Sequence, residues 1–374
     1  YKTLANLGLG GTSMVYYQNG SLVMNPLYMD RLAAPNLKWE KTTSYNVGLD
    51  FAFFGSRLTG SFDYYFKNTT DMIMAQRLPS FSGFGSILAN LGEVHNSGFE
   101  LSLNSTNIQT KDFKWTTAAG ISLNKNKIIH IYYDYDENGV ERDDSSNGWF
   151  IGKAANEIWY YETDGVWQNT PEDIKQAALV GQKPGDPKVV NNYTEDDKIL
   201  SDGTRVPVYN DKDKTFLGPQ TPPIYWNMRN DFEWKDFTFA FSRYSYMGHK
   251  SLSGNWLNQD NGGSQVTNCF NMPDKKYWTP DNPTNDYCRL DAKGPNTGLA
   301  GGVSKLYNRS FLRLDNISVG YTLPREMTRK FMVDRIHLTF SCNNVFTISG
   351  WEYGDPETGG FATRTFNFGV NVTL

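Results

Sequence analysis

Alternation of apolar and polar residues is the main pattern along this chain, and it is clearest between Glu40 and Lys67. Two alternating runs in this stretch are joined by a break at Gly55-Ser56. Side chains on a strand point to opposite faces with a period of two, so each run has one apolar and one polar face. The apolar positions are Tyr45, Val47, Leu49, Phe51, Phe53, Leu58, Phe62, Tyr64 and Phe66. The pattern predicts a β-hairpin.

Further alternating runs bring the expected number of strands to about nine. Their apolar positions begin at Phe99, Phe113, Ile224, Phe237, Ile317, Ile336 and Phe366. Short turns such as Lys235-Asp236 join some of these runs, whereas Lys125 to Pro222 and Met247 to Ser310 separate others without a clean strand pair. The sequence therefore predicts long strands whose connections alternate between short and long.

Three connecting segments carry predictions of their own. Tyr1 to Asn36 is rich in Gly and Asn and poorly periodic, which predicts mostly loop. Asn68 to Leu91, which contains Pro79, predicts an irregular connection. Pro171 to Leu179 predicts a short helix, because Thr170 can cap it and acidic residues in the first turn face the positive end of the helix dipole.

Alternation alone fits two architectures. A soluble β-sandwich buries the apolar face in a core, whereas an outer-membrane barrel turns that face to lipid and keeps the polar face inside. Short connections that alternate with long ones along the whole chain are typical of a barrel, which has short turns at one rim and long loops at the other. Since bacterial barrels of one chain have even strand numbers, about nine strands predict a portion of a larger barrel.

The barrel interpretation also assigns a lipid-facing side. The expected lipid-facing residues are Tyr45, Val47, Leu49, Phe51, Phe62, Tyr64, Phe99, Leu101, Ile121, Phe239, Val319, Leu338 and Phe368. The last run, Phe366 to Leu374, is expected to pair with the first strand of the complete barrel, because an open strand edge does not persist in lipid.

Composition narrows the function classes. The net charge is -4 with a pI of about 5.7, which gives no basic surface for nucleic acid. Mean hydropathy is -0.55, and no apolar run reaches the roughly 18–20 residues of a membrane helix. The three cysteines exclude a disulfide-dense scaffold; pairing of Cys269 with Cys288 stays open, and Cys342 fits a small apolar strand position. A start at Tyr1 predicts a mature piece or a fragment.

No catalytic or metal motif emerges from the residues. Asp134, Asp136, Asn138 and Gly139 have the spacing of a calcium-binding loop, but Ser145 stands where the bidentate Glu belongs. These residues therefore predict a solvated acidic turn. The histidines form no HExxH pair, and no Ser or Cys lies in a G-x-S-x-G turn. We accordingly expect no metal, no cofactor and no enzyme activity.

The aromatic and acidic segment from Trp149 to Trp167 is the best binding candidate. Aromatic rings stack on the apolar faces of sugars, carboxylates accept hydrogen bonds from hydroxyl groups, and peptide side chains can use the same groups. In the alternative interpretation, the rings pack a long loop that needs a small core of its own. The candidate ligand-binding residues are Trp149, Trp159, Tyr160, Tyr161, Asp164 and Trp167.

Motifs along nearly the whole chain resemble the SusC/RagA family of TonB-dependent outer-membrane transporters. They are PNLKWEKTT at 35–43, DYY at 63–65, TDMI at 70–73, NLGEV at 90–94, NSGFE at 96–100, TDGVWQ at 163–168, PGD at 184–186, YWTPDNP at 277–283, SFLRLDNISVGY at 310–321, CNNVF at 342–346 and GDPE at 354–357. In place of the family's Asn-Gly-Asp-Gly turn, the chain has EDDK at 195–198 and SDG at 201–203, which puts a cation site there in doubt.

The resemblance implies an all-β fold, a 22-stranded antiparallel transmembrane barrel with long extracellular loops. Residues 1–374 would form its C-terminal part, and the plug and the N-terminal strands would lie outside this chain. The family implies the outer membrane of a Gram-negative, Bacteroidetes-like bacterium, energy from a TonB complex and a SusD-like surface lipoprotein as partner. The implied function is import of oligosaccharides; import of oligopeptides is the alternative, and a soluble extracellular carbohydrate-binding β-sandwich remains a third possibility.

Overall fold

The computed structural model describes residues 4–9, 15–24, 27–254, 256, 259–260, 263–264 and 275–374. Nine long strands form one sheet in the order β5-β6-β9-β10-β17-β18-β23-β24-β25. Their bounds are Lys41–Phe53, Leu58–Thr70, Glu93–Gln109, Phe113–His130, Ile224–Trp234, Phe237–Met247, Phe311–Thr322, Arg335–Ser349 and Thr365–Thr373. The prediction of about nine alternating strands is confirmed. The sheet ends at β5 and β25 and does not close on itself, so the 22-stranded barrel stays a prediction.

Short strands form two-stranded pairs in the connections. The pairs are β1 (Asn6–Leu9) with β4 (Leu27–Arg31), β2 (Val15–Gln18) with β3 (Ser21–Met24), β7 (Ile73–Arg77) with β8 (Ser86–Asn90), β11 (Glu157–Tyr160) with β16 (Thr215–Pro219), β12 (Thr163–Val166) with β13 (Pro187–Val189), β14 (Lys198–Ile199) with β15 (Arg205–Val206), β19 (Lys250–Ser253) with β22 (Lys305–Asn308), and β20 (Gln259–Asp260) with β21 (Gly263–Ser264).

The chain divides into two compact units. The first contains Tyr1–Phe51, Ser61–Leu101 and Ser122–Ala155, and the second contains Ala52–Gly60, Ser102–Ile121 and Asn156–Leu374. In the first unit, the expectation of mostly loop before residue 37 is wrong, because β1 to β4 lie there. Asn19 and Gly20 have φ of 51° and 80°, the left-handed values of a two-residue hairpin turn, and this turn pairs Gln18 with Ser21.

The connection from Asn68 to Leu91 is also more ordered than expected, because it contains the hairpin β7–β8 and a short 3-10 helix, Ser80–Ser82. Its ends are tied to the segment before β5. The Asn90 side chain accepts a hydrogen bond from Lys38 N at 2.5 Å and donates to Lys38 O at 2.9 Å. The Glu40 carboxylate accepts from Ile73 N at 2.9 Å. These bonds join the PNLKWE motif to the β7–β8 connection that ends at NLGEV.

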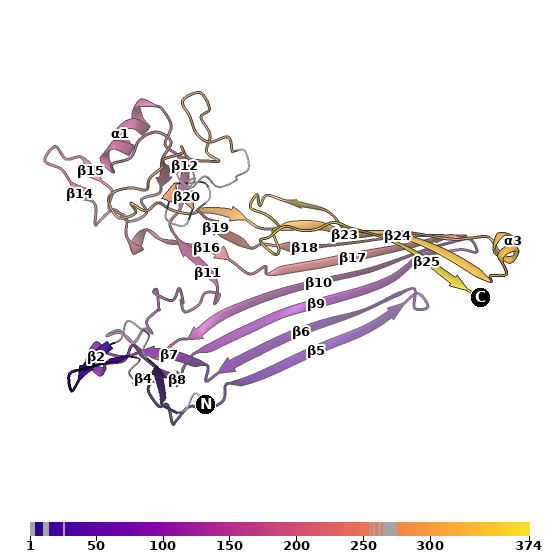
Figure 1. Cartoon of the computed structure of the whole chain (residues 1–374), viewed down its shortest axis with the longest axis horizontal. Helices are drawn as coiled ribbons and strands as arrows, with labels where there is room; N and C mark the ends of the chain where they lie inside the picture. Colours follow the sequence, from indigo (N-terminus) through magenta and orange to yellow (C-terminus); the bar gives the residue numbers. More distant parts are fainter. Residues whose placement is uncertain are drawn as a thin grey trace. The chain divides into compact units, whose positions relative to one another are not determined.

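In the second unit, β17, β18, β23, β24 and β25 lie side by side, and every neighbouring pair is antiparallel (Figure 1). Their registers align apolar residues across all five strands. One such row is Phe232, Phe239, Val319, Phe340 and Phe368, and the next is Trp234, Phe237, Tyr321, Leu338 and Val370. The row between them on the opposite face is Glu233, Thr238, Gly320, Thr339 and Gly369. We call the first side the apolar face.

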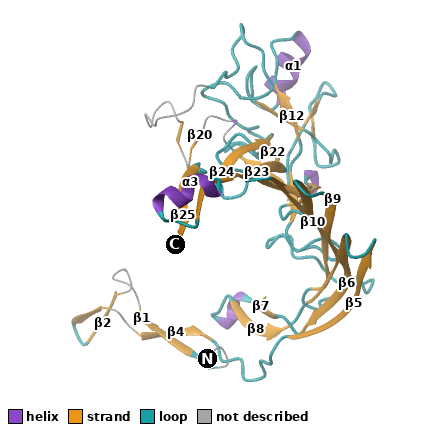
Figure 2. Cartoon of the chain, turned by 90° about the vertical axis from the view of Figure 1, so that its right-hand side faces the viewer, coloured by secondary structure: helices purple, strands orange, loops and turns teal. Residues whose placement is uncertain are grey.

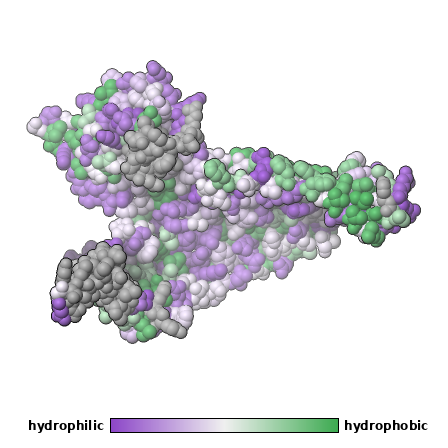
Figure 3. Space-filling view, in the orientation of Figure 1, coloured by the Kyte–Doolittle hydropathy of each residue, from purple (hydrophilic) through white to green (hydrophobic). Residues whose placement is uncertain are grey.

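Large side chains on the apolar face are exposed: Phe368 is 71% exposed and Phe340 is 48% exposed. Apolar side chains gather over β24 and β25 beside α3 (Arg325–Thr328) (Figure 3). A β-bulge interrupts the register of β18 with β23 after Ser242, and another interrupts β23 with β24 after Leu314. Bulges bend a strand locally, so the face changes shape at this level.

The helices are short. The predicted helix is confirmed as α1 (Pro171–Leu179), where Thr170 Oγ1 accepts a hydrogen bond from Asp173 N at 3.2 Å; Figure 2 shows it among the loops of the second unit. The other α-helix in the described residues is α3, and 3-10 turns lie at Asp211–Asp213 and Arg329–Phe331 in addition to Ser80–Ser82. In the described part of the chain, no helix has the length and apolar character needed to cross a membrane.

Candidate functional site

In the second unit, the part of the β10–β17 loop that begins at Asn156 and the loop from β18 to β23 share one hydrophobic core. We call it the loop core; its buried residues are Tyr161, Val166, Val180, Val189, Tyr209, Trp256, Trp278, Cys288, Ala292 and Val303. Trp256 is fully buried and its Nε1 donates to Val303 O at 2.8 Å. Since both loops contribute side chains, neither can bury its apolar residues alone, and together they form one folded body.

Asp186 organises the polar part of this body. Its carboxylate is buried and accepts hydrogen bonds from Lys183 N and Lys293 N, each at 3.0 Å. The guanidinium of Arg289 forms an ion pair with it at 2.8 Å. Gly185, at φ of 90°, lies so close to Trp278 that a Cβ would stand 2.6 Å from the Trp ring. The PGD and YWTPDNP motifs are therefore contacts between the two loops.

Two of the predicted binding residues, Tyr160 and Tyr161, pack against or within the loop core, and a third, Trp167, is buried in the same loop. Tyr161 and Trp167 are 8% and 7% exposed, and the indole N–H of Trp167 donates to Gln182 Oε1 at 2.9 Å. Tyr160 packs against the core, and its hydroxyl accepts from Ser304 N at 3.3 Å. The structure thus gives these rings a packing role, as the alternative interpretation described.

The other three candidates differ from one another. Trp159 is half-buried, with Lys214 Nζ 4.5 Å from the centre of one of its rings. Asp164 is exposed and forms an ion pair with Lys188 at 3.2 Å. Trp149 belongs to the first unit, where its backbone exchanges two hydrogen bonds of 2.9 Å with Asp144. Ligand binding by the six residues stays a prediction.

The carboxylates of the acidic turns accept hydrogen bonds from neighbouring groups of the protein. One oxygen of Asp136 accepts from Asn138 N at 2.8 Å and from Val140 N at 2.9 Å, as in an ordinary Asx turn. In the segment that departs from the family turn, the Asp197 carboxylate accepts from Asn191 Nδ2 and Val208 N. Among the described residues, no group of three or more His, Cys, Asp or Glu is arranged to hold a metal ion.

The cysteine predictions are settled in part. Cys288 is buried in the loop core, and this burial raises the pKa of its thiol well above the usual value. Cys269 lies outside the described residues, so its pairing with Cys288 stays a prediction. Cys342 is buried in β24, as a small apolar strand residue would be.

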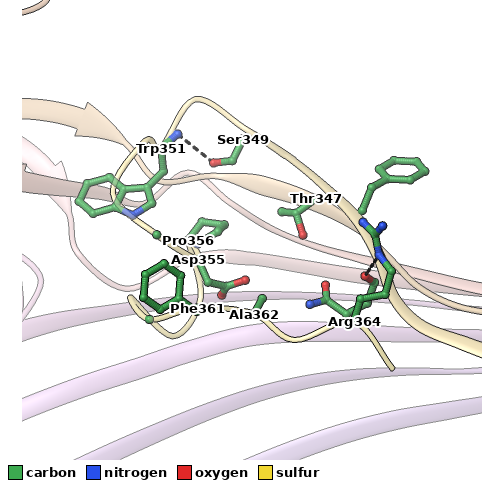
Figure 4. A pocket seen from close by; sticks show the side chains of 12 residues that line it. Thr347, Ser349, Trp351, Asp355, Pro356, Phe361, Ala362 and Arg364 are labelled. Carbon is green, nitrogen blue, oxygen red and sulfur yellow. Dashed lines mark hydrogen bonds between the residues drawn. The ribbon is translucent and has the colours of Figure 1, made fainter. Parts of the chain in front are cut away.

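A pocket that the sequence did not predict lies between the end of β24 and the loop that leads to β25. Its volume is about 340 Å³. Figure 4 shows the indole of Trp351 and the ring of Phe361 on the loop that forms one side, with the Asp355 carboxylate and Arg364 nearby. The pocket is lined by Asn344, Phe346, Thr347, Ser349, Trp351, Gly354, Asp355, Pro356, Gly360, Phe361, Ala362 and Arg364. It combines aromatic faces, carboxylate and amide groups and one cation.

A buried ion pair fixes this loop to the sheet. Arg313 of β23 donates from Nη2 to the Asp355 carboxylate, and its Nη1 lies 3.2 Å from Glu357 Oε2. Tyr244 donates its hydroxyl to the same Glu357 oxygen at 2.6 Å. Asp355 also accepts from Thr358 N at 3.0 Å. We call Arg313, Asp355 and Glu357 the loop anchor; it joins the FLRLDN and GDPE motifs, whose contact the sequence does not reveal.

The anchor also sets the charge of its central carboxyl group. Burial by itself would raise the pKa of Asp355, but hydrogen bonds from Thr358 N and Glu357 N and the Arg313 guanidinium outweigh it. The pKa of Asp355 is therefore lowered from its ordinary value, and the carboxylate is charged at neutral pH.

An aromatic cluster connects the pocket to the other long loop. Tyr307 of β22 and Tyr353 join their hydroxyls at 2.8 Å, and the ring of Trp351 meets both edge-on. The Arg309 guanidinium lies 5.3 Å from the centre of a Trp351 ring and donates to Pro356 O. Trp351 is thus held in one orientation, with part of its ring half-exposed in the pocket.

The family model "TonB dependent receptor-like, beta-barrel" matches residues 9–345. The chain belongs to the TonB-dependent receptor β-barrel family. A TonB-dependent receptor, P3, of Formosa agariphila is 31% identical over 369 residues, which cover 96% of this chain and 34% of that protein. The TonB-dependent receptor SusC of Bacteroides thetaiotaomicron is 28% identical over 340 residues, 86% of this chain and 30% of that protein.

The solved RagAB peptide transporter has the same fold as this TonB-dependent receptor barrel, with a TM-score of 0.71 and 23% identity over 100% of this chain and 39% of that one. The prediction of a SusC/RagA-like barrel is therefore confirmed. The barrel segment spans about a third of the length of the curated relatives that it matches.

Proposed function

We propose that this chain forms part of the wall and several extracellular loops of a TonB-dependent outer-membrane transporter that imports oligosaccharides. The observation that carries the proposal is the apolar face, a side of the sheet on which large residues align across five strands and stay exposed. Such a face is stable in lipid and unfavourable in water. The opposite rows of Thr, Ser, Asn and Gly suit a water-filled interior.

The pocket behind Trp351 and the loop body supply the substrate contacts in this proposal. An aromatic face with neighbouring carboxylate and amide groups is the combination that recognises a sugar ring, through stacking and hydroxyl hydrogen bonds. Trp159 and Asp164 present accessible surface on the loop body, and with Trp149 they remain proposed contacts. Tyr161 in the loop core, Tyr160 packed against it and the buried Trp167 would support this surface from below.

Import of oligopeptides is the second candidate, supported by the shared fold with the RagAB peptide transporter. The same aromatic and charged groups fit peptide side chains and termini. For either substrate, we propose a SusD-like surface lipoprotein as partner on the loops and energy from a TonB complex that contacts other parts of the complete protein.

The membrane assignment is tested by labelling single cysteines in cells. Val319→Cys on the apolar face is expected to resist a water-soluble thiol reagent and to react with a lipid-soluble one. Ser318→Cys, its neighbour on the polar face, is expected to show the reverse. Equal labelling of both positions by the water-soluble reagent would contradict a barrel wall and favour a soluble sandwich.

The transport assignment is tested by uptake of fluorescent oligosaccharides and oligopeptides into cells that depend on the intact transporter. Trp351→Ala is expected to lower uptake of one substrate class severalfold while surface levels stay normal. Trp234→Ala, which also removes an exposed indole but from the apolar face, is the matched control and should leave uptake unchanged. Uptake of neither class, or an equal loss in both variants, would refute the role of the pocket.

A further inference from the structure

The apolar face carries one charged side chain. In the registers of β17, β18, β23, β24 and β25, Arg243 is aligned with Met228, Leu314 and Phe346. The other positions that these registers place on this face are apolar, or are the neutral residues Asn230 and Ser245. Arg229, on the adjacent strand but on the polar face, has a carboxylate partner in Asp231 at 2.7 Å.

Arg243 borders an apolar groove of about 320 Å³. The two β-bulges, after Ser242 and after Leu314, lie at the same level and change the spacing of side chains there. The groove is otherwise lined entirely by apolar residues, which are Phe239, Phe241, Leu312, Leu314, Ile317, Phe346 and Ile348.

The guanidinium of Arg243 lacks an anion among the described residues. Its Nη2 lies 3.1 Å from the sulfur of Met228, a weak acceptor, and its centre is 5.8 Å from a ring of Trp226. The Nε atom is inaccessible and has no hydrogen-bond partner. An unpaired cation on an apolar surface is costly, and an anion beyond the described residues would lower this cost.

The depth of Arg243 indicates which anion. The short turns, which face the periplasm in such barrels, lie at the Phe237 end of β18. Six residues separate Phe237 from Arg243, about 20 Å along the strand and about 15 Å along the membrane normal at a tilt of ~40°. Ile336 and Val372 extend the apolar face one row further down. Arg243 therefore lies about 20 Å above the lowest apolar row, in the upper part of an apolar band ~25 Å tall, from which its long side chain can extend toward the outer headgroups.

We propose that Arg243 and this groove bind a phosphorylated lipid of the outer leaflet. The guanidinium fork donates to the phosphate, since arginine binds phosphate oxygens in a bidentate manner, and an acyl chain lies in the groove. The proposal rests on the proposed membrane location, because only a barrel wall brings this groove to lipid. It assigns a structural lipid to the protein in addition to its cargo.

The test measures lipid retention on the purified intact transporter in detergent by native mass spectrometry. The probes are dioleoyl phosphatidic acid and dioleoylglycerol, which share acyl chains and differ in the phosphate. The wild type is expected to retain the phosphorylated lipid more strongly. Arg243→Gln should weaken that binding about tenfold, the typical effect of removing a charged hydrogen-bond partner, and leave dioleoylglycerol unchanged. Arg229→Gln is the matched control and should behave as the wild type.

A second variant tests the groove. Leu314→Trp fills it and is expected to weaken retention of both lipids, whereas added inorganic phosphate should not displace either. Equal affinity of wild type and Arg243→Gln for phosphatidic acid, an equal loss in Arg229→Gln, or displacement by inorganic phosphate would overturn the proposal. Retention needs no transported substrate, so a wrong substrate assignment leaves this result intact, whereas failure of the Val319 labelling test would remove the proposed function itself.

Discussion

Removing the Asp355 carboxylate is expected to release the loop between β24 and β25. Asp355→Ala leaves the buried Arg313, a residue that is 7% exposed, with Glu357 as its one remaining charged partner among the described residues. Breaking a buried ion pair by deleting one member typically costs about 3–5 kcal/mol. Because Glu357 remains, we expect the lower end, about 3 kcal/mol, in the free energy of local opening. Each 1.4 kcal/mol is a factor of ten, so opening becomes about 100-fold more frequent.

Hydrogen exchange of the intact transporter measures this opening. The amide of Gly359 is the best reporter, because it donates to the backbone carbonyl of residue 355 at 2.8 Å and not to the deleted side chain. Asp334→Ala removes an exposed ion pair with Arg325 at the opposite end of the sheet, where such pairs contribute about 0–1 kcal/mol. Unchanged exchange at Gly359 in Asp355→Ala, or equal acceleration in both variants, would refute the anchor.

Further predictions concern pH, packing and depth. Because the folded pKa of Asp355 is below its ordinary value of 3.8, the stability that this carboxylate contributes is complete above that pH and is lost as the pH falls through the folded pKa; exchange at Gly359 should therefore accelerate in acid. Gly185→Ala should destabilise the loop core by about 1–3 kcal/mol beyond its backbone strain and speed proteolysis of the loops, whereas Gly203→Ala, which has the same kind of positive-φ strain but an added Cβ that meets nothing within 4 Å, should cost less. Val319→Arg should cost about 2–4 kcal/mol in urea unfolding if it lies near the midplane, with little effect from Ser318→Arg.

The long strands could be predicted because a strand between lipid and water must alternate apolar and polar residues, and this alternation can be seen in consecutive positions of the sequence. The helix at Pro171–Leu179 was equally local, since Thr170 and the acidic first turn are adjacent to it. The hairpin at Asn19 does not follow from periodicity, because its strands are only four residues long and lie in a glycine-rich segment, although its Asn-Gly turn is a strong local signal.

The site could be predicted only in part, because its contacts join residues far apart in sequence. Val166 N donates to Asn285 Oδ1 across 119 positions, and Arg313 meets Asp355 across 42. No periodicity encodes such pairs. The aromatic segment did identify a folded loop body, but the distinction between a ring that packs and a ring that binds depends on the second loop, whose residues complete the core that buries Tyr161.

The shared loop core also orders events in time. Its residues run from Tyr161 to Val303, and β17 and β18 lie between its two halves in the sequence. The first loop is synthesised before the second, so it cannot complete the loop core alone. Its aromatic rings stay exposed to water until the second loop reaches the same side of the membrane. The loop core can therefore fold only after β18 and β23 have both been inserted. A protease that cleaves only unfolded loops would distinguish a fully inserted sheet from a partly inserted one.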